Sequence, residues 1–283
     1  MSLRVQAVGA SVLVQDLGRP GFAHLGVPRS GALDRPAAAL ANRLVGNDPG
    51  AACLEVLLGG LSVSADQGVW VSVTGAPCSV EVDGRPREFG EAVRLTTGSL
   101  LTLGAPTSGV RSYVAVAGGI DVAPVLGSRS TDTLGGVGPA PVAAGDVLAT
   151  GTPVSAPAAL DTPRPPARGR LRITAGPRAD RVGGDVLALL ERTSYAVSPD
   201  SDRIGLRLVG ESLPLAPYAE LPSEGVVLGA VQLPPDGRPV VFLADHPTTG
   251  GYPVVAVVDE DDLWQCAQLR PGERVEFTRA ARG

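Results

Sequence analysis

Short apolar segments separated by turn residues recur along most of the chain. The clearest pair covers residues 226–233 and 239–243, with Pro-Pro-Asp-Gly at residues 234–237 between them. Because proline presets φ and glycine accepts positive φ, this spacer predicts a tight turn, and the pair predicts a β-hairpin. The second segment runs into a polar loop at residues 245–253, which contains a carboxylate, an imidazole, two hydroxyls and two adjacent glycines. Such a loop favours the surface and lets a ligand approach its backbone closely.

The same pattern predicts further strands and one helix. The strands are expected within residues 3–17, 51–64, 68–74, 78–82, 92–96, 100–103 and 111–117, with a hairpin turn at residues 82–85. The helix is expected at residues 35–45, where Asp34 can cap the start, Pro36 lies in the first turn and Gly46 ends it. Leu40 and Leu44 are spaced to face the core. Residues 155–168 are rich in proline and alanine and are typical of a linker.

After this linker the pattern starts again. Residues 3–5 (LRV) return as residues 171–173 (LRI), an offset of 171 − 3 = 168. Residues 43–46 and 207–210 are both RLVG, an offset of 207 − 43 = 164, and Glu55 matches Glu224 at 224 − 55 = 169. Ordered matches at a nearly constant offset indicate a duplicated domain. We therefore expect a mainly β protein with two related domains, residues 1–165 and 166–283, whose different loops build one shared polar site.

Composition narrows the classes of function. A chain of 283 residues with 44% hydrophobic residues can bury a sizeable core, and 37 glycines with 26 prolines favour many short strands. The net charge of −5 argues against a nucleic-acid binder. With no apolar run near the roughly 18–20 residues that span a bilayer, and no signal-like start, a cytoplasmic protein is expected. The three cysteines have no C-x-x-C spacing and are expected to be reduced and buried.

The chain contains no lysine, so all 24 of its Lys and Arg residues are arginines. This excludes a P-loop lysine, a Schiff-base lysine and a biotinyl-lysine on this chain. Any clamp for a carboxylate or phosphate must use arginine, which binds such groups in bidentate geometry.

Several polar residues are open to two interpretations. Asp245 is either a functional carboxylate or the cap of a turn. His24 and His246 are too isolated to form a metal site, and each is expected at the surface. Tyr252 can contact a ligand or pack, and Glu224 is expected to share a structural role with Glu55. The loop arginines Arg19, Arg29, Arg129 and Arg203 are either solvated or bind a ligand.

Five blocks of the sequence resemble one protein family over essentially the whole chain. They are VQDLGRPGFAHLGVPRSGALDRPAAALANRLVGN, RSYVAVAGGID, LGSRSTD, SPDSDRIGLRL and SEGVVLGAVQLPPDGRPVVFLADHPTTGGYP. The family is variously called allophanate hydrolase subunit 2, the biotin-dependent carboxyltransferase family, KipA, or the 5-oxoprolinase C subunit. The resemblance implies a fold of two cyclophilin-like β-barrels with a few short helices. It also implies a partner that completes the site, the allophanate hydrolase subunit 1 or 5-oxoprolinase B subunit (KipI-like).

The resemblance implies three alternative functions. In the leading interpretation the chain is the C subunit of a 5-oxoprolinase that works with the A and B subunits and with ATP to open 5-oxoproline to glutamate. The alternative is a carboxyltransferase acting on urea or a related amide, with biotin supplied by another protein. The third is a KipA-like regulator that binds a kinase-inhibitor protein without catalysis.

The same resemblance implies a set of site residues. Asp34, Arg203 and Asp245 are the expected catalytic residues, and no metal ligand is expected. The expected substrate contacts are Gln15, Asp16, Arg19, Ser30, Arg129, Glu224, Gln232, Thr248, Thr249 and Tyr252. Many relatives carry Asp-Arg-Gln where this chain has Asp245, His246 and Pro247, so a role for that arginine does not transfer.

Overall fold

The computed structural model describes residues 1–158, 168–215 and 221–280. The chain forms two compact units, which we call the first and the second unit. The first unit comprises Met1–Arg19, Ser30–Asp132 and Gly136–Pro165, and the second comprises Pro20–Arg29, Thr133–Gly135 and Pro166–Gly283. Two short segments from the first half of the sequence therefore belong to the second unit. Within the described residues, no helix has both the length and the apolar character needed to cross a bilayer.

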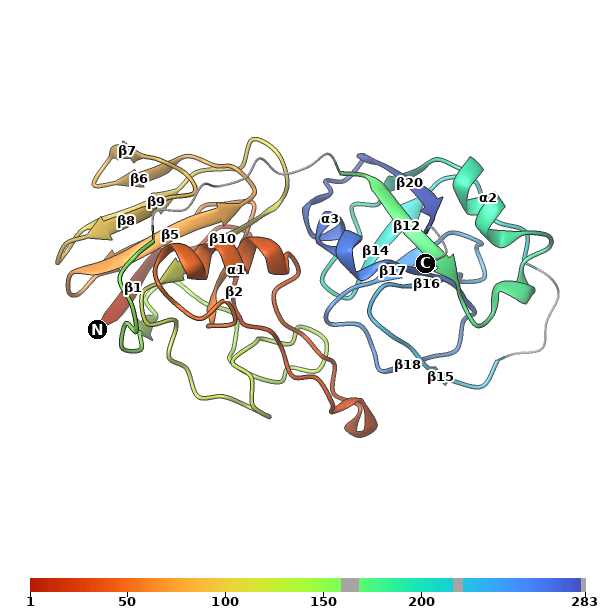
Figure 1. Ribbon diagram of the computed structural model, residues 1–283, viewed down its shortest axis with the longest axis horizontal. Helices are drawn as coiled ribbons and strands as arrows, with labels where there is room; N and C mark the ends of the chain where they lie inside the picture. The colour runs from red at the N-terminus through yellow and green to blue at the C-terminus, as the bar shows by residue number, and fades with distance from the viewer. Residues whose placement is uncertain (159–167, 216–220, 281–283) are drawn as a thin grey trace. The chain divides into compact units, whose positions relative to one another are not determined.

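The first unit is built from two β-sheets (Figure 1). The six-stranded sheet has the order β11-β1-β4-β9-β6-β7, and the five-stranded sheet has the order β2-β3-β10-β5-β8. Their bounds are β1 Ser2–Ala7, β2 Ser11–Gln15, β3 Cys53–Leu57, β4 Ser62–Ala65, β5 Val69–Gly75, β6 Val80–Val82, β7 Arg85–Arg87, β8 Ala92–Leu95, β9 Leu100–Leu103, β10 Arg111–Val116 and β11 Val147–Ala149. All pairings within these two sheets are antiparallel.

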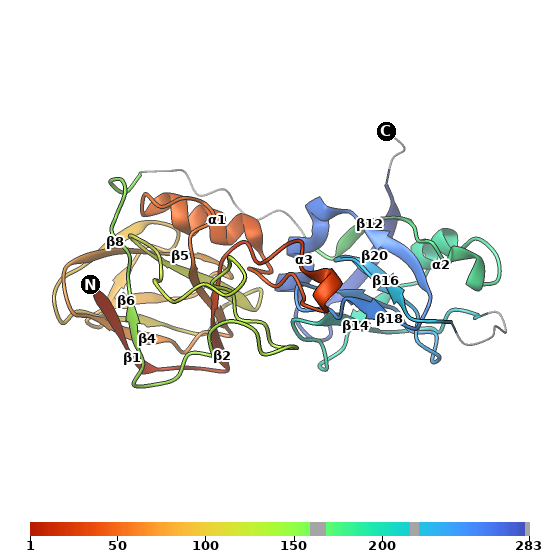
Figure 2. The same cartoon turned by 90° about the horizontal axis from the view of Figure 1, so that it is seen from below.

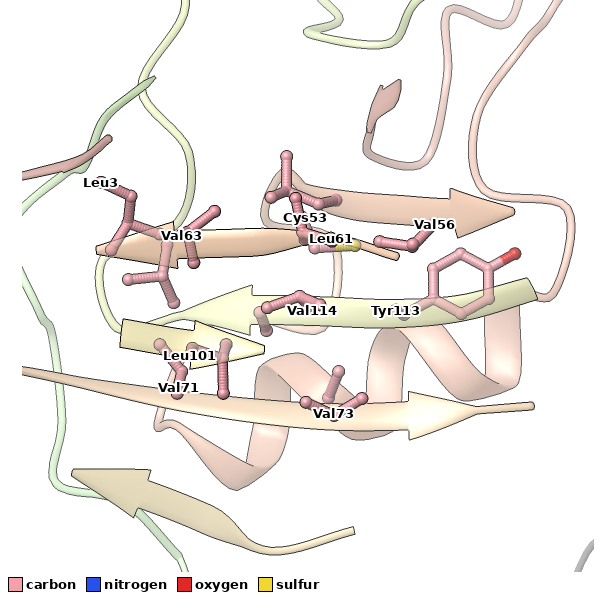
Figure 3. Packing of buried hydrophobic residues seen from close by; sticks show 14 of the residues in the cluster. Leu3, Cys53, Val56, Leu61, Val63, Val71, Val73, Leu101, Tyr113 and Val114 are labelled. Carbon is pink, nitrogen blue, oxygen red and sulfur yellow. The ribbon is translucent and has the colours of Figure 1, made fainter. Parts of the chain in front are cut away.

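The core of the first unit contains apolar side chains from both sheets. Figure 3 shows Val71, Val73 and Val114 of the five-stranded sheet gathered with Val63 and Leu101 of the six-stranded sheet, and all five are buried. Because successive side chains of a strand point to opposite faces, these valines leave the other face of the five-stranded sheet to different residues. Burial of apolar area contributes roughly 25 cal/mol per Å², so this cluster stabilises the unit.

The other face of the five-stranded sheet carries α1, Arg35–Leu44 (Figures 1 and 2). The helix begins as predicted, because the Asp34 carboxylate accepts a hydrogen bond of 3.0 Å from the Ala37 amide. It ends before Gly46, which has a φ of 76°. Leu44 is buried as expected, whereas Leu40 is only partly buried. Small alanines on the buried side let the helix approach the sheet closely.

The second unit contains a closed barrel with the order β12-β19-β16-β17-β14-β13-β20, sealed by a parallel pairing of β12 with β20. The bounds are β12 Arg170–Ala175, β13 Tyr195–Val197, β14 Gly205–Val209, β16 Ala230–Gln232, β17 Val240–Phe242, β19 Val254–Val258 and β20 Arg274–Arg279. A separate two-stranded sheet pairs β15 (Glu224–Gly225) with β18 (Thr249–Gly250). Two α-helices, α2 Val186–Arg192 and α3 Leu263–Gln268, and three 3-10 turns, η1 Ala23–Leu25, η2 Ala179–Arg181 and η3 Glu260–Asp262, complete the described elements of this unit.

Alternate side chains along the strands point inward and fill the barrel interior. In β20, Val275 and Phe277 are buried while their neighbours in the strand are more exposed, and Phe277 makes an edge-to-face contact with Tyr195 at 5.9 Å between ring centroids. The hairpin predicted around residues 234–237 is confirmed, since β16 and β17 pair antiparallel and Gly237 has a φ of 71°. The barrel thus places the polar loop after β17 at a strand end.

The predicted mainly β fold with a few short helices is confirmed. The first unit nevertheless differs from a single cylinder, because its described strands form two sheets with facing apolar surfaces. Residues 51–64 also form two strands, β3 and β4. Leu58, Gly59 and Gly60 between them all have positive φ, which interrupts an extended strand. Most of the expected linker at residues 155–168 lies outside the described residues.

The repeat matches do not all join equivalent elements. Residues 3–5 and 171–173 do lie in the first strand of each half, β1 and β12. Residues 43–46, however, end a helix, whereas residues 207–210 lie mostly in β14. Glu55 is buried in β3, while Glu224 is partly exposed in β15, so the expected shared role of the two glutamates is wrong. Identical residue types at similar spacing here reflect different local structures.

Candidate functional site

A carboxylate organises the loops at the end of β2 in the first unit. Asp16 accepts hydrogen bonds from the Ser128 and Ser130 hydroxyls, each 2.6 Å, and from the backbone amides of Arg129 (2.6 Å) and Gly18 (2.7 Å). Three of these donors fix residues 128–130 against the end of β2, and the fourth, the Gly18 amide, closes the turn after Asp16. Hydrogen bonds to a charged acceptor are stronger than neutral ones, so this arrangement is rigid. We call residues 16–18 and 128–131 the Asp16 loop cluster.

Two further predicted residues bind the backbone of the same cluster. Arg19 is 1% exposed and donates through its guanidinium to the Ser130 carbonyl. Gln15 is 0% exposed and donates from Nε2 to the Thr131 carbonyl at 2.9 Å. Gly138, at a φ of 97°, packs so closely on the Ser130 carbonyl that a Cβ would lie 2.1 Å from it. Both expected substrate contacts are therefore engaged in holding this loop.

Arg129 and Ser30 lie beside this arrangement in different ways. The Arg129 guanidinium turns away to the Val122 carbonyl (2.8 Å) and Asp121 (3.2 Å), and its side chain is 39% exposed. Ser30 is buried with a φ of 54°, in the left-handed region that non-glycine residues rarely adopt. Its Oγ, like Oε1 of Gln15, has no hydrogen-bond partner among the described residues. Both oxygens are buried and keep unused hydrogen-bonding capacity.

In the second unit, Asp245 and Arg203 form a buried ion pair. Arg203 Nε lies 2.9 Å from Asp245 Oδ2 and its Nη2 lies 3.2 Å from Oδ1. Thr133 donates to the same Oδ2 through its amide (3.0 Å) and its hydroxyl (2.7 Å). Burial acts to raise the pKa of Asp245, but Arg203 and Thr133 outweigh it and hold that pKa below its ordinary value. The carboxylate thus stays ionised and ties segment Thr133–Gly135 into the unit.

His246 departs from its expected surface position. It is 7% exposed, and its ring stacks on Phe242 with centroids 5.7 Å apart. Its Nδ1 lies 2.6 Å from the Pro247 carbonyl oxygen. Burial lowers the pKa of His246, so the ring is neutral at pH 7. The expected surface position was wrong because the sequence shows only that His246 belongs to a polar loop, whereas in the fold its ring packs on Phe242. His24 is exposed as expected.

The remaining predicted residues of the second unit surround the β15–β18 pair. Glu224 accepts from the Arg178 guanidinium in bidentate fashion, with Arg178 Nε 3.0 Å from Oε2, and both side chains are about one-third exposed. Arg178 holds the pKa of Glu224 below its ordinary value. Gln232 is buried and donates to the Tyr252 carbonyl at 3.1 Å. We call β15, β18, Arg178 and residues 248–252 the flap.

The flap is more exposed than the Arg203–Asp245 pair. The Tyr252 residue is 47% exposed, Thr249 is exposed and Thr248 is partly buried. Backbone pairing of Glu224 with Gly250 fixes the flap, and the Val226 amide donates to the Thr248 carbonyl at 3.0 Å. An ion pair beside hydroxyls and a phenol can bind a polar, charged small molecule through several directional contacts.

The structure therefore groups the predicted residues into clusters within each unit. The first unit brings together Gln15, Asp16 and Arg19, with Ser30, Arg129 and Asp34 on neighbouring segments. The second brings together Arg203 with Asp245, and Glu224 with Gln232, Thr248, Thr249 and Tyr252. One site shared by both units stays a prediction. Thr133 and Arg178 were missed, because nothing in their flanking residues distinguishes them from ordinary loop positions. In the described ranges no group of three or more His, Cys, Asp or Glu side chains is placed to hold a metal ion.

Comparison with known proteins defines the class to which this fold belongs. Residues 25–279 match the model of the carboxyltransferase domain, subdomains A and B, and the chain belongs to that family. It is 38% identical to the 5-oxoprolinase C subunit of Escherichia coli (strain K12) over 286 residues, 99% of this chain and 91% of that protein. It is 31% identical to the 5-oxoprolinase C subunit of Haemophilus influenzae over 95% of this chain and 88% of that protein.

A solved structure extends the likeness to a second activity within the family. The crystal structure of the Kluyveromyces lactis urea carboxylase matches with a TM-score of 0.92 at 29% identity. The match covers 99% of this chain but 27% of that protein.

Proposed function

We propose that this chain is the C subunit of a bacterial 5-oxoprolinase, which acts with the A and B subunits and ATP to convert 5-oxo-L-proline to L-glutamate. The observation that carries the proposal is the 38% identity to the Escherichia coli C subunit across 99% of this chain and 91% of the relative. The match spans nearly all of that subunit, whereas the match to urea carboxylase spans 27% of that protein. Both bacterial relatives are named as subunits, which supports dependence on partner chains.

The chemistry of the substrate explains why polar, preorganised loops are needed. A lactam carbonyl is a poor electrophile, and transfer of the γ-phosphoryl group of ATP to its oxygen converts that oxygen into a leaving group. Charge develops on the phosphoryl oxygens during this transfer, and arginine is the basic side chain that the chain has for stabilising it. Arg19 and Arg203 are buried in internal contacts. Arg178 and Arg129 are paired with Glu224 and Asp121, but their side chains remain 35% and 39% exposed. We therefore assign phosphate contacts first to Arg178 and Arg129.

The experiment is a reconstitution with the two partner subunits. The complete mixture is expected to release glutamate from 5-oxoproline in an ATP-dependent manner, with ADP formed in equal amount. Matched controls leave out this chain, either partner, or ATP. If all three chains bind one another but no glutamate forms, the proposal is wrong.

A carboxyltransferase acting on urea or a related amide is the second candidate, supported by the family model and by the fold likeness to urea carboxylase. Because the chain has no lysine, biotin would have to be attached to another protein. Transfer of label from a carboxybiotinyl carrier protein to urea, dependent on this chain, would favour this candidate over the first.

A further inference from the structure

The helix-facing side of the five-stranded sheet carries a row of side chains that the sequence did not suggest as functional. Leu13, Glu55, Tyr113 and Thr74 are direct cross-strand neighbours on β2, β3, β10 and β5. Opposite residues of antiparallel strands point to the same face, so these four lie in one line under α1. Tyr113 is 0% exposed and Glu55 is 3% exposed. A carboxylate is costly to bury unless it is paired and hydrogen-bonded.

Glu55 and Tyr113 use this position to bind the backbone that leads into α1. The Tyr113 hydroxyl donates to Glu55 Oε2 at 2.8 Å, and the Leu33 amide donates to the same oxygen at 3.1 Å. The Tyr113 oxygen accepts from the Asp34 amide at 2.8 Å. Arg111 Nε lies 3.4 Å from Glu55 Oε1 and balances its charge. Two successive backbone N–H groups are thus fixed by one buried pair.

The chemistry of the pair keeps it in this arrangement. Burial, together with the negative charges of Glu55 and Asp34, raises the pKa of Tyr113 well above its ordinary value. The phenol therefore stays protonated and acts as a donor to the carboxylate and an acceptor from the amide. Since the buried ion pair of Glu55 with Arg111 contributes little more to stability than apolar residues of similar size, fixing this backbone is the more specific effect of Glu55 and Tyr113.

Two neighbouring residues on the same face of the sheet bind only the helix α1. Thr74 donates to the Ala37 carbonyl and Ser72 donates to the Ala41 carbonyl, each at 2.7 Å. Both bonds hold the body of α1, and neither reaches residues 30–34. Within this row, the amides of Leu33 and Asp34 are bound by Glu55 and Tyr113.

We infer that Tyr113 and Glu55 are positioning residues that fix the backbone of residues 33 and 34 and thereby set Asp34 in the geometry that the substrate site requires. The inference rests on the proposed function, because Asp34 is a site residue only within it. It adds residues of the sheet interior to a site otherwise built from loops. A misplacement of about 1 Å at a site can lower the rate by about a hundredfold.

Tyr113→Phe and Thr74→Val form a matched pair of variants for the test. The two positions face each other across β10 and β5, and each change removes one buried hydroxyl with little change in volume. We expect a larger loss of thermal stability in Tyr113→Phe, because its hydroxyl makes two hydrogen bonds, one of them to a carboxylate, whereas the Thr74 hydroxyl makes one. In the reconstituted complex, kcat for glutamate release is expected to fall by about ten- to a hundredfold in Tyr113→Phe and by less than about threefold in Thr74→Val, with KM little changed. Glu55→Gln is expected to follow Tyr113→Phe, and replaces it if that variant lacks a cooperative unfolding transition.

Amide hydrogen exchange of Leu33 and Asp34 in the isolated chain provides a readout independent of activity. Exchange is expected to be at least about tenfold faster in Tyr113→Phe than in Thr74→Val. An active wild-type complex in which the two variants have equal kcat would overturn the inference. An inactive wild-type complex would overturn the proposed function instead. The amide exchange rates would then test the inference, and equal rates in the two variants would contradict it.

Discussion

Arg203 and Asp245, which lie 42 residues apart in the sequence, form a bidentate ion pair with side chains 6% and 0% exposed. The pair also holds Thr133, a residue from the first half of the chain, in the second unit. With four hydrogen bonds already made to its two oxygens, Asp245 is arranged to position a backbone segment. Its expected part in catalysis stays a prediction, and the variants below separate the two roles.

Replacing Asp245 by Asn should strongly destabilise the second unit. The substitution removes the negative charge that the buried Arg203 guanidinium faces at 2.9 Å, and breaking such a pair costs about 3–5 kcal/mol. The free energy of unfolding in urea measures the loss. Glu276→Gln is the matched control, because its pair with Arg170 is 50% and 73% exposed at 3.8 Å and should contribute less than about 1 kcal/mol. Equal effects of the two changes would contradict the buried clamp.

The clamp should also make stability depend on pH in the acid range. The pKa of Asp245 is lowered in the folded protein, so its contribution is complete above the unfolded value of about 3.9 and is lost as the pH falls through the folded pKa. The difference in unfolding free energy between wild type and Asp245→Asn should therefore be constant from about pH 5 to 7 and shrink below about pH 4. Urea titrations at a series of pH values measure this difference. A difference that grows as the pH falls would contradict the lowered pKa of Asp245.

Asp16→Ala should loosen residues 128–131 selectively. The change removes an acceptor of four hydrogen bonds, and bonds to a charged group contribute about 1.5–3 kcal/mol each without being additive. We expect a loss of about 3 kcal/mol and much faster amide exchange at Arg129. Asp48→Ala is the control, since Asp48 caps an exposed turn through the Gly50 amide. Protection of Arg129 unchanged in Asp16→Ala would contradict the role of the carboxylate.

Glu224→Gln should separate binding from stability. Its pair with Arg178 is about one-third exposed on both sides and is screened by solvent, so the loss of unfolding free energy should be small. If Glu224 holds Arg178 in place for a phosphate contact, KM for ATP in the reconstituted complex should rise by about tenfold, because the substitution weakens the pair that orients the Arg178 guanidinium. A variant as active as wild type would remove Glu224 from the site.

The three cysteines should not react in the folded protein. Cys53, Cys78 and Cys266 are free and buried, and burial raises the pKa of Cys266 to about 12. Because the thiolate is the reactive form, modification by a disulfide reagent at about pH 8 should be slow and should follow unfolding. All three thiols are expected to react at once in urea. Rapid labelling of a thiol in buffer would show that its site opens locally.

The sequence by itself determined the local structure. Asp34, Pro36 and Gly46 determine where α1 begins and ends, and Asp83 and Gly84, both at positive φ, determine the turn between β6 and β7. These signals act within a few residues, through capping, turn geometry and alternation, so they are readable along the chain. The five sequence blocks that resemble the family likewise identify it from the sequence.

Only the tertiary structure decided what the polar residues do. Asp16, Asp34 and Asp245 look alike in the sequence as carboxylates in glycine-rich loops. The structure makes one a loop clasp, one a helix cap and one half of a buried ion pair. Their partners include residues 112 positions away, such as Ser128 and Thr133. Whether a charged group is free or paired depends on burial and on the partners that folding brings to it, and neither is encoded in the neighbouring residues.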